Sequence, residues 1–204
     1  MKIQVGVMGA AGGPISDAEL ELARRVGRRI AEHACVIVTG ACPGLPHAAV
    51  LGAHGAGGFS LGVSPAHSRE EHTDVYLSPL EPYDAIVFTG SGLMGREVHN
   101  IHSSDLVIFI GGRSGTLGEF AIAYDEGKLI GVLLNSGGLS NQLSTIAEMC
   151  HKTTGARLFE SENPETLVDH CLDLFVNTPM PTSTVFDPKA APNMLERATM
   201  RARG

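Results

Sequence analysis

The sequence predicts a single α/β domain built on one doubly wound, mostly parallel sheet of about seven strands, with helices on both faces. Short apolar runs alternate with segments of helical period along almost the whole chain. Several runs are unbroken stretches of Val, Ile and Leu, which is typical of parallel strands covered on both faces. Seven strands are too few for a closed eightfold barrel, so an open sheet with right-handed crossovers is favoured.

The strands are expected where the apolar runs lie, and the helices fill the gaps between them. The clearest runs are contained in the segments DAIVFTGS and DLVIFIGG. The expected strands are 3–9, 35–40, 59–64, 85–89, 106–110, 129–134 and 156–159, and the expected helices are 17–33, 45–56, 93–103, 117–127, 139–151 and 164–176.

Two of these helices have clear start signals. Ser16 and Glu19 form an S-x-x-E capping box before the first helix. Asn163 is the expected N-cap of the last helix, with Pro164 at its first helical position.

Two segments interrupt the alternation of strands and helices. Residues 65–84 show no clear period, and a loop of that length inside a compact domain is typically a lid, a binding loop or an interface arm. Residues 178–204 contain four prolines and a basic end, and we expect either partial disorder or an arm that wraps a partner subunit. The predicted domain therefore spans residues 1–177.

Composition argues against two classes of partner. The 15 basic and 22 acidic residues give a formal net charge of −7, so a broad nucleic-acid-binding surface is not expected. No apolar run approaches 18 residues and no signal-peptide pattern occurs, so no membrane partner is expected. The four cysteines form no C-x-x-C pair, which is typical of a reduced, soluble, cytoplasmic protein.

The histidines and cysteines offer only weak signals of chemistry. The pairs His47/His54 and His99/His102 have spacings that suit a metal, but no Cys or carboxylate stands at a diagnostic interval, so no metal site is expected. Cys42 would need a depressed pKa and a nearby base, such as His47, to act as a nucleophile.

Three turns at the expected carboxyl ends of strands are rich in glycine, and each leads into a helix. Ligands of open α/β sheets bind at this edge. Glycines allow a close approach of the backbone, and the free N–H groups and dipole of a helix start favour an anion. The candidate phosphate-binding residues are Gly9, Gly12 and Gly13 in the first turn, Thr39, Gly40 and Gly44 in the second, and Gly111, Gly112, Arg113, Ser114, Gly115 and Thr116 in the third.

The common nucleotide motifs are absent. The first turn does not have the G-x-G-x-x-G spacing, and no acidic residue ends the second strand, so NAD-dependent oxidoreduction is disfavoured. No G-x-x-x-x-G-K-[ST] segment occurs, which excludes a P-loop nucleotide triphosphatase. A mononucleotide or another phosphorylated small molecule is the expected ligand.

The third turn belongs to a longer motif. Residues 111–119 read GGRSGTLGE and resemble the P-G-G-x-G-T-x-x-E motif of the Lonely Guy family. Residues 39–58, TGACPGLPHAAVLGAHGAGG, resemble the second strand-end turn of the same Rossmann-like superfamily, and residues 95–105, GREVHNIHSSD, resemble its G-R-N-x-x-x-x-x-S-x-D pattern. The resemblance covers about residues 3–176 and is greatest to the branch of molybdenum cofactor carrier proteins and uncharacterised nucleotide-binding relatives.

The chain departs from the Lonely Guy pattern at three positions. Gly111 stands in place of the proline, and Arg113 in place of the second glycine. Arg96 of the usual Arg-Lys pair is kept, but Glu97 replaces the lysine. The acidic position is kept at Glu119.

The resemblance implies a binding protein for a nucleotide or the molybdenum cofactor, assembled as a homodimer or a higher homo-oligomer, with no cofactor required. The alternative that it implies is a nucleoside 5′-monophosphate phosphoribohydrolase, in which Arg96 holds the sugar phosphate and Glu119 stabilises positive charge or moves a proton. Glu119 has a second reading, because Thr116 and Glu119 also form a T-x-x-E capping box. The label "lysine decarboxylase", once given to such sequences, is disfavoured because none of the four lysines lies in a glycine-rich strand-end turn.

Overall fold

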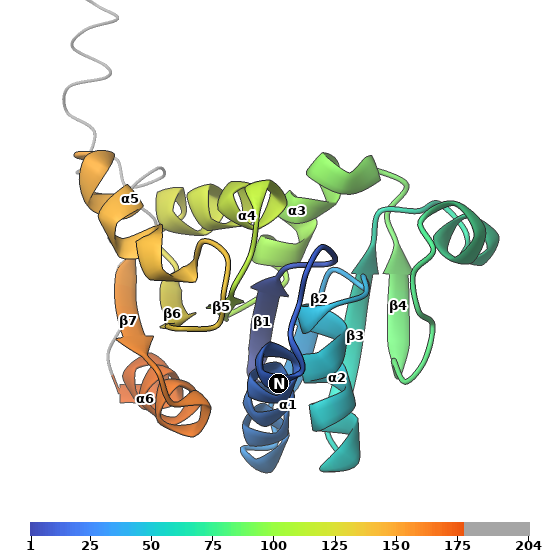
Figure 1. Ribbon diagram of the computed structural model, residues 1–204, viewed down its shortest axis with the longest axis horizontal. Coiled ribbons are helices and arrows are strands. Elements are labelled where there is room, and N and C mark those ends of the chain that lie inside the picture. The colour runs from blue at the N-terminus through green and yellow to red at the C-terminus, as the bar shows by residue number, and fades with distance from the viewer. Residues whose placement is uncertain (178–204) are drawn as a thin grey trace, which may run out of the picture.

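The structure, a computed structural model, describes residues 1–177 and has one seven-stranded sheet covered by helices on both faces (Figure 1). Every neighbouring pair of strands is parallel, in the order β4-β3-β2-β1-β5-β6-β7. The predicted fold class is thus confirmed. The expectations for residues 178–204 lie outside the described residues. The strands are β1 (Gln4–Gly9), β2 (Val36–Thr39), β3 (Phe59–Ser64), β4 (Ala85–Phe88), β5 (Leu106–Ile110), β6 (Leu129–Leu133) and β7 (Arg157–Ser161).

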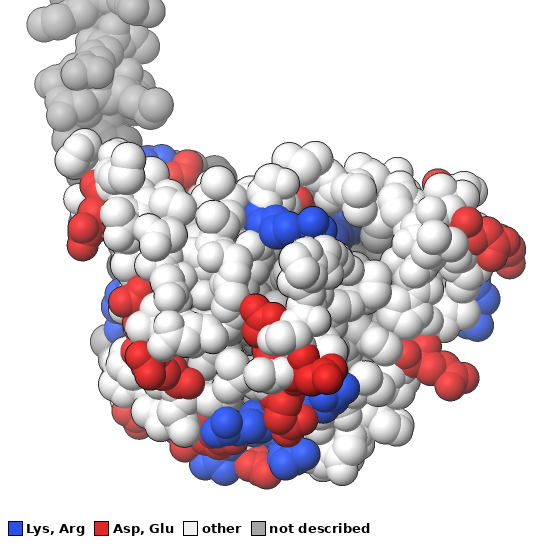
Figure 2. All heavy atoms as spheres, viewed as in Figure 1, with Lys and Arg blue, Asp and Glu red and all other residues white. Residues whose placement is uncertain are grey.

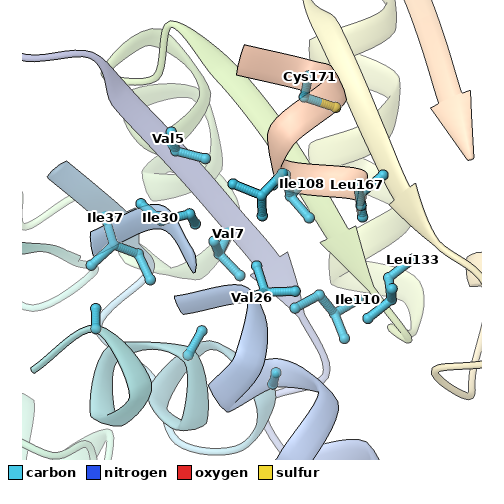
Figure 3. Close-up of a cluster of buried hydrophobic side chains, with 14 of the residues drawn as sticks. Val5, Val7, Val26, Ile30, Ile37, Ile108, Ile110, Leu133, Leu167 and Cys171 are labelled. Atoms are coloured by element: carbon cyan, nitrogen blue, oxygen red, sulfur yellow. The ribbon is translucent and has the colours of Figure 1, made fainter. Parts of the chain in front are cut away.

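The helices divide between the two faces. One hydrophobic cluster packs the sheet against α1, α2 and α6, and Figure 3 shows side chains of this cluster. A second cluster packs the other face against α3, α4 and α5. β5 and β6 are buried along their whole length, as expected for central parallel strands. The helices are α1 (Asp17–Glu32), α2 (Leu45–Gly55), α3 (Gly92–His102), α4 (Ser114–Asp125), α5 (Leu143–Met149) and α6 (Pro164–Asn177).

Glycines set the close approach of α1 and α2. A methyl group added at Gly27 would overlap the carbonyl oxygen of Ala49, and one added at Gly52 would overlap the carbonyl oxygen of Arg24. Only residues without a Cβ let the two backbones touch in this way.

Both predicted helix starts are present. The Ser16 hydroxyl accepts from the Glu19 N–H (3.3 Å), and the Glu19 carboxylate accepts in return from the Ser16 N–H (2.6 Å). Asn163 Oδ1 accepts from the N–H of Thr166 (2.8 Å), which caps α6.

Most element boundaries lie within one residue of the sequence-based expectation, and those of α4, α5 and β7 differ by more. Helix α4 begins at Ser114 rather than at 117, directly after the extended backbone of Arg113. Positive φ angles at Gly137 and Gly138 delay the next helix, which splits into a 3-10 turn, η2 (Ser140–Gln142), and α5. The last strand begins at Arg157 rather than at 156 and extends to Ser161.

The segment 65–84 is not structureless. It contains a short π-helical turn, η1 (Glu71–Val75), and the buried His72 of this turn has two partners. His72 Nε2 lies 3.0 Å from the Pro79 carbonyl oxygen, and Nδ1 lies 2.8 Å from the Ser64 hydroxyl. Because a carbonyl oxygen only accepts, Nε2 donates to Pro79, while the Ser64 hydroxyl lies within hydrogen-bond distance of Nδ1.

None of the helices within residues 1–177 is long and apolar enough to cross a bilayer.

Candidate functional site

A cavity of about 480 Å³ lies where β1 and β2 end, beneath α3 and α4. Figure 2 shows basic side chains in a hollow between α4 and the loop that follows β1. This is the sheet edge at which open α/β folds bind ligands. The cavity is lined by Val7, Met8, Gly9, Ala10, Ala11, Gly40, Cys42, Pro46, Leu93, Met94, Arg96, Glu97, Arg113, Ser114, Gly115, Thr116 and Glu119.

The first turn of α4 forms one wall of the cavity. Ser114, Gly115 and Thr116 are its first three residues, and the helix has no side-chain N-cap. The first N–H groups of a helix have no intrahelical partner, and the helix dipole adds positive potential there. This wall therefore offers hydrogen-bond donors to an anion.

A buried ion pair joins α3 to α4 at the floor of the cavity. Arg96 Nη1 donates to Glu119 Oε1 at 3.0 Å, and Asn100 Nδ2 donates to the same oxygen at 3.2 Å. Both charged side chains are less than a tenth exposed. Arg96 Nε is buried and has no hydrogen-bond partner among residues 1–177.

These contacts decide between the two readings of Glu119. Its carboxylate contacts Arg96 and Asn100, and no hydrogen bond to Thr116 is present, so the capping-box reading is wrong. Burial raises the pKa of Glu119 to about 7, against the opposing charge of Arg96. A carboxyl group with such a pKa exchanges a proton near neutral pH.

Glu97 is a cavity residue that the sequence analysis noted only as a departure from the Lonely Guy pattern. It is buried, it lines the cavity, and its carboxylate lies against α4 at Gly115 and Gly118. Burial raises its pKa, with Arg96 acting in the opposite direction. The signal in the sequence was the pair of glycines spaced i, i+3 on α4, which leaves a gap for a side chain from a neighbouring helix.

Arg113 lies between this cavity and a second hollow of about 180 Å³. Its guanidinium packs against the glycines of the turn after β1, since a methyl group at Gly13 would lie 3.0 Å from Arg113 Nη1. Gly12, Gly111 and Gly112 line the second hollow. The first and third glycine turns therefore meet at Arg113.

The second glycine turn contributes fewer predicted residues. Gly40 lines the cavity, and the Arg96 guanidinium lies directly against it. A methyl group at Gly40 would overlap this guanidinium, so the position requires glycine. Thr39 and Gly44 line neither hollow. The Thr39 hydroxyl pairs with the Tyr83 hydroxyl (2.8 Å), and Gly44 (φ 79°) passes close to the carbonyl oxygen of Ala10.

The structure brings the remaining predicted site residues together. Gly9, Gly40, Arg96, Arg113, Ser114, Gly115, Thr116 and Glu119 all line the large cavity. Cys42 also lines it, but burial raises the pKa of its thiol to about 11, and His47 Nε2 lies 2.8 Å from the Glu81 carbonyl oxygen. These contacts do not describe an activated thiol. Among residues 1–177, no three His, Cys, Asp and Glu side chains are placed to hold a metal ion.

Comparison with known proteins identifies relatives of this architecture. An uncharacterized protein from Archaeoglobus fulgidus is 32% identical over 172 residues, which are 83% of this chain and 95% of the relative. The solved structure of a molybdenum cofactor binding protein from Rippkaea orientalis is 26% identical, with a TM-score of 0.69 over 85% of this chain and 98% of that one. The molybdenum cofactor carrier protein from Chlamydomonas reinhardtii has the same fold, with 24% identity and a TM-score of 0.70 over 87% of this chain and 100% of that one. The profile of the SLOG cluster4 family, a group of Lonely Guy-like Rossmann proteins, matches residues 2–168. The chain therefore belongs to the SLOG cluster4 family.

Proposed function

We propose that this protein binds a phosphorylated small molecule, a mononucleotide or a nucleotide-like cofactor, in the cavity beneath α3 and α4. The observation that carries the proposal is Arg96, which lines that cavity and whose buried Nε has no hydrogen-bond partner among residues 1–177. A buried unsatisfied donor costs about 1–3 kcal/mol, which a ligand acceptor would recover.

Two further groups support an anionic ligand. The uncapped first turn of α4 presents N–H groups to the cavity, and Arg113 adds a second positive charge at its edge. Hydrogen bonds to a phosphate contribute about 1.5–3 kcal/mol each, so three or four of them suffice for micromolar affinity after association costs.

The similarity to a molybdenum cofactor binding protein supports a cofactor-like ligand. The residues of the cavity fit the phosphate end of such a cofactor, since Arg96, Arg113 and the first residues of α4 line the same volume. In this reading the cofactor is cargo, and the chain's own residues hold and shield it.

Calorimetric titration with AMP, GMP, ribose 5-phosphate and inorganic phosphate tests the proposal. We expect micromolar binding of at least one organic phosphate and roughly tenfold weaker binding by Arg113→Ala. Arg28→Ala is the matched control, because Arg28 is an exposed arginine on α1, away from the cavity. Absence of binding by every phosphorylated compound at millimolar concentration would overturn the proposal.

A second candidate function is hydrolysis of the N-glycosidic bond of a nucleoside 5′-monophosphate. The observation that favours it is Glu119, whose pKa is raised to about 7 beside Arg96. Glu119 would stabilise the oxocarbenium-like sugar or move a proton to or from water, while Arg96 holds the phosphate or a ribose hydroxyl. Release of base and ribose 5-phosphate from AMP, abolished by Glu119→Gln, is the expected result; equal release by that variant would remove Glu119 from the reaction.

Homo-oligomer formation completes the proposal. Leu93 and Met94 at the mouth of the cavity, and Val98 on the same helix, are exposed apolar side chains. A second copy that covers α3 would bury them and lie beside the cavity. Light scattering would show a dimer or a larger assembly, and Val98→Glu would shift it towards the monomer.

A further inference from the structure

Glu97 is a mostly buried residue that lines the cavity, and no protein group donates a hydrogen bond to its carboxylate among residues 1–177. The residue is 5% exposed, and no hydrogen bond or ion pair to it is present among residues 1–177. The neighbouring Glu119, by contrast, accepts from both Arg96 and Asn100. Buried carboxylates in folded proteins are normally paired, so an unpaired one that faces a cavity indicates a donor that arrives with the ligand.

Helix α4 leaves space for this carboxylate. A methyl group at Gly118 would lie 2.6 Å from Glu97 Oε2, and one at Gly115 would lie 3.4 Å from Oε1. Glycine at two positions inside a helix costs about 0.5–1 kcal/mol each relative to alanine. The first two turns of α4 are thus shaped to admit the carboxylate at the expense of helix stability.

The surroundings of Glu97 restrict the shape of the group that it meets. Leu93 and Met94 also line the cavity and are 57% and 70% exposed. These two side chains supply apolar surface to the cavity that Glu97 also lines. Apolar walls with one acceptor at the edge suit a flat heterocycle that presents adjacent N–H groups.

We infer that Glu97 accepts paired hydrogen bonds from the 2-amino-4-oxo-pyrimidine edge that guanine and pterin rings share, so that the cavity selects phosphorylated ligands of this class. The inference rests on the proposed function, because the phosphate of the same molecule would meet the donors of Arg96, Arg113 and α4. The ring N–H and the adjacent amino group both donate, whereas a carboxylate only accepts, so the two edges are complementary. Hypoxanthine keeps only the ring N–H, and adenine places an acceptor nitrogen where the carboxylate would lie.

Calorimetric titration of the full chain with GMP, IMP, AMP and neopterin monophosphate tests the inference, and each titration is run with EDTA and with Mg²⁺. We expect GMP or neopterin monophosphate, or both, to bind at least tenfold more tightly than IMP, and AMP to bind most weakly. Comparison of GMP with neopterin monophosphate shows which of the two rings is preferred. In Glu97→Gln the preferred ligand should weaken at least tenfold while IMP changes little. Glu148→Gln, an exposed glutamate on α5, is the matched control.

A second readout separates ligand recognition from a purely structural role. Glu97 has no partner to lose, so Glu97→Gln should melt at the same temperature as the wild type, or higher, while the preferred ligand raises its melting temperature less. Equal affinities for GMP, IMP and AMP that Glu97→Gln leaves unchanged would overturn this inference and leave phosphate binding intact. If Glu97→Gln weakens binding only in the presence of Mg²⁺, then Glu97 contacts a metal ion rather than the ring of the ligand. That result would also overturn the inference. Absence of binding by all four ligands would overturn this inference, and absence of binding by ribose 5-phosphate and inorganic phosphate as well would overturn the proposed function.

Discussion

Arg96 and Glu119 form a hydrogen-bonded ion pair of 3.0 Å between α3 and α4, and both side chains are less than a tenth exposed. The pair closes the floor of the cavity, and Glu119 also accepts from Asn100. Because Arg96 Nε remains without a partner among the described residues, the pair satisfies the carboxylate better than the guanidinium. The anionic ligand proposed above would offer this guanidinium a further acceptor.

Breaking the ion pair from one side should destabilise the fold strongly. Arg96→Leu leaves the buried Glu119 with Asn100 as its remaining partner and should lower the free energy of unfolding by about 3 kcal/mol. The double variant Arg96→Leu/Glu119→Leu should lose clearly less than the sum of the two single changes. Urea denaturation of the four proteins measures the cycle, and strict additivity would contradict a direct coupling.

Glu119 should make stability depend on pH in a definite direction. Burial raises its pKa from 4.5 to about 7, so folding favours the protonated form. That contribution to stability is complete below pH 4.5 and is lost as the pH rises through 7. Relative to Glu119→Gln, the wild type should therefore lose up to roughly 3 kcal/mol of unfolding free energy between pH 4.5 and pH 7.5. Denaturation curves across this range check the result, and parallel pH profiles of the two proteins would refute it.

The two glycines of α4 that lie against Glu97 should respond differently to alanine. Gly118→Ala places a methyl group 2.6 Å from Glu97 Oε2, so the carboxylate must move, whereas the 3.4 Å contact at Gly115 is an ordinary one. Both variants should keep or gain stability, since alanine favours the helix by about 0.5–1 kcal/mol. We expect Gly118→Ala to reduce discrimination among GMP, IMP and AMP, and Gly115→Ala to reduce it less. Calorimetric titration of both variants with GMP, IMP and AMP measures this discrimination. An equal loss of discrimination in Gly118→Ala and Gly115→Ala would contradict the assigned position of Glu97.

Glycines of α2 provide a matched pair for the packing of α1. Gly52→Ala drives a methyl group into the backbone of α1 at Arg24, and overpacking of this kind costs about 1–3 kcal/mol. Gly55 in the same helix has no heavy atom within 4 Å of the added methyl position. Gly55→Ala should therefore be neutral or slightly stabilising. Thermal unfolding of the two variants distinguishes them, and a tolerated Gly52→Ala would show that the helices can separate.

Much of the fold could be predicted because the central strands are unbroken apolar runs. Residues 106–110 form β5 within the bounds that the sequence predicts. The start of α4 was placed too late, because the first periodic apolar residue, Leu117, comes after an uncapped turn of Ser114, Gly115 and Thr116. No local pattern distinguishes such a turn from a loop.

The site was predictable where one segment carries its own signal and not where two helices combine. Most residues of the first and third glycine turns were placed at the candidate cavity because glycine-rich strand ends are informative in isolation, whereas Arg96 was singled out through the resemblance to the Lonely Guy pattern. Glu119 had two local readings, and the contact with Arg96, 23 residues away in the chain, decides between them. The position of Glu97 depends on glycines of a facing helix, and a single sequence does not show which helix faces pair.

His72 connects the end of β3 to a distant part of the segment 65–84, which the irregular sequence of this segment does not suggest. One imidazole ring is attached at Nδ1 to the end of β3 and at Nε2 to the stretch that returns towards β4. The outgoing and returning parts of the segment are thus joined through one side chain. Replacing the ring by phenylalanine would remove both hydrogen bonds at once, and one of them ends at Ser64, the last residue of β3.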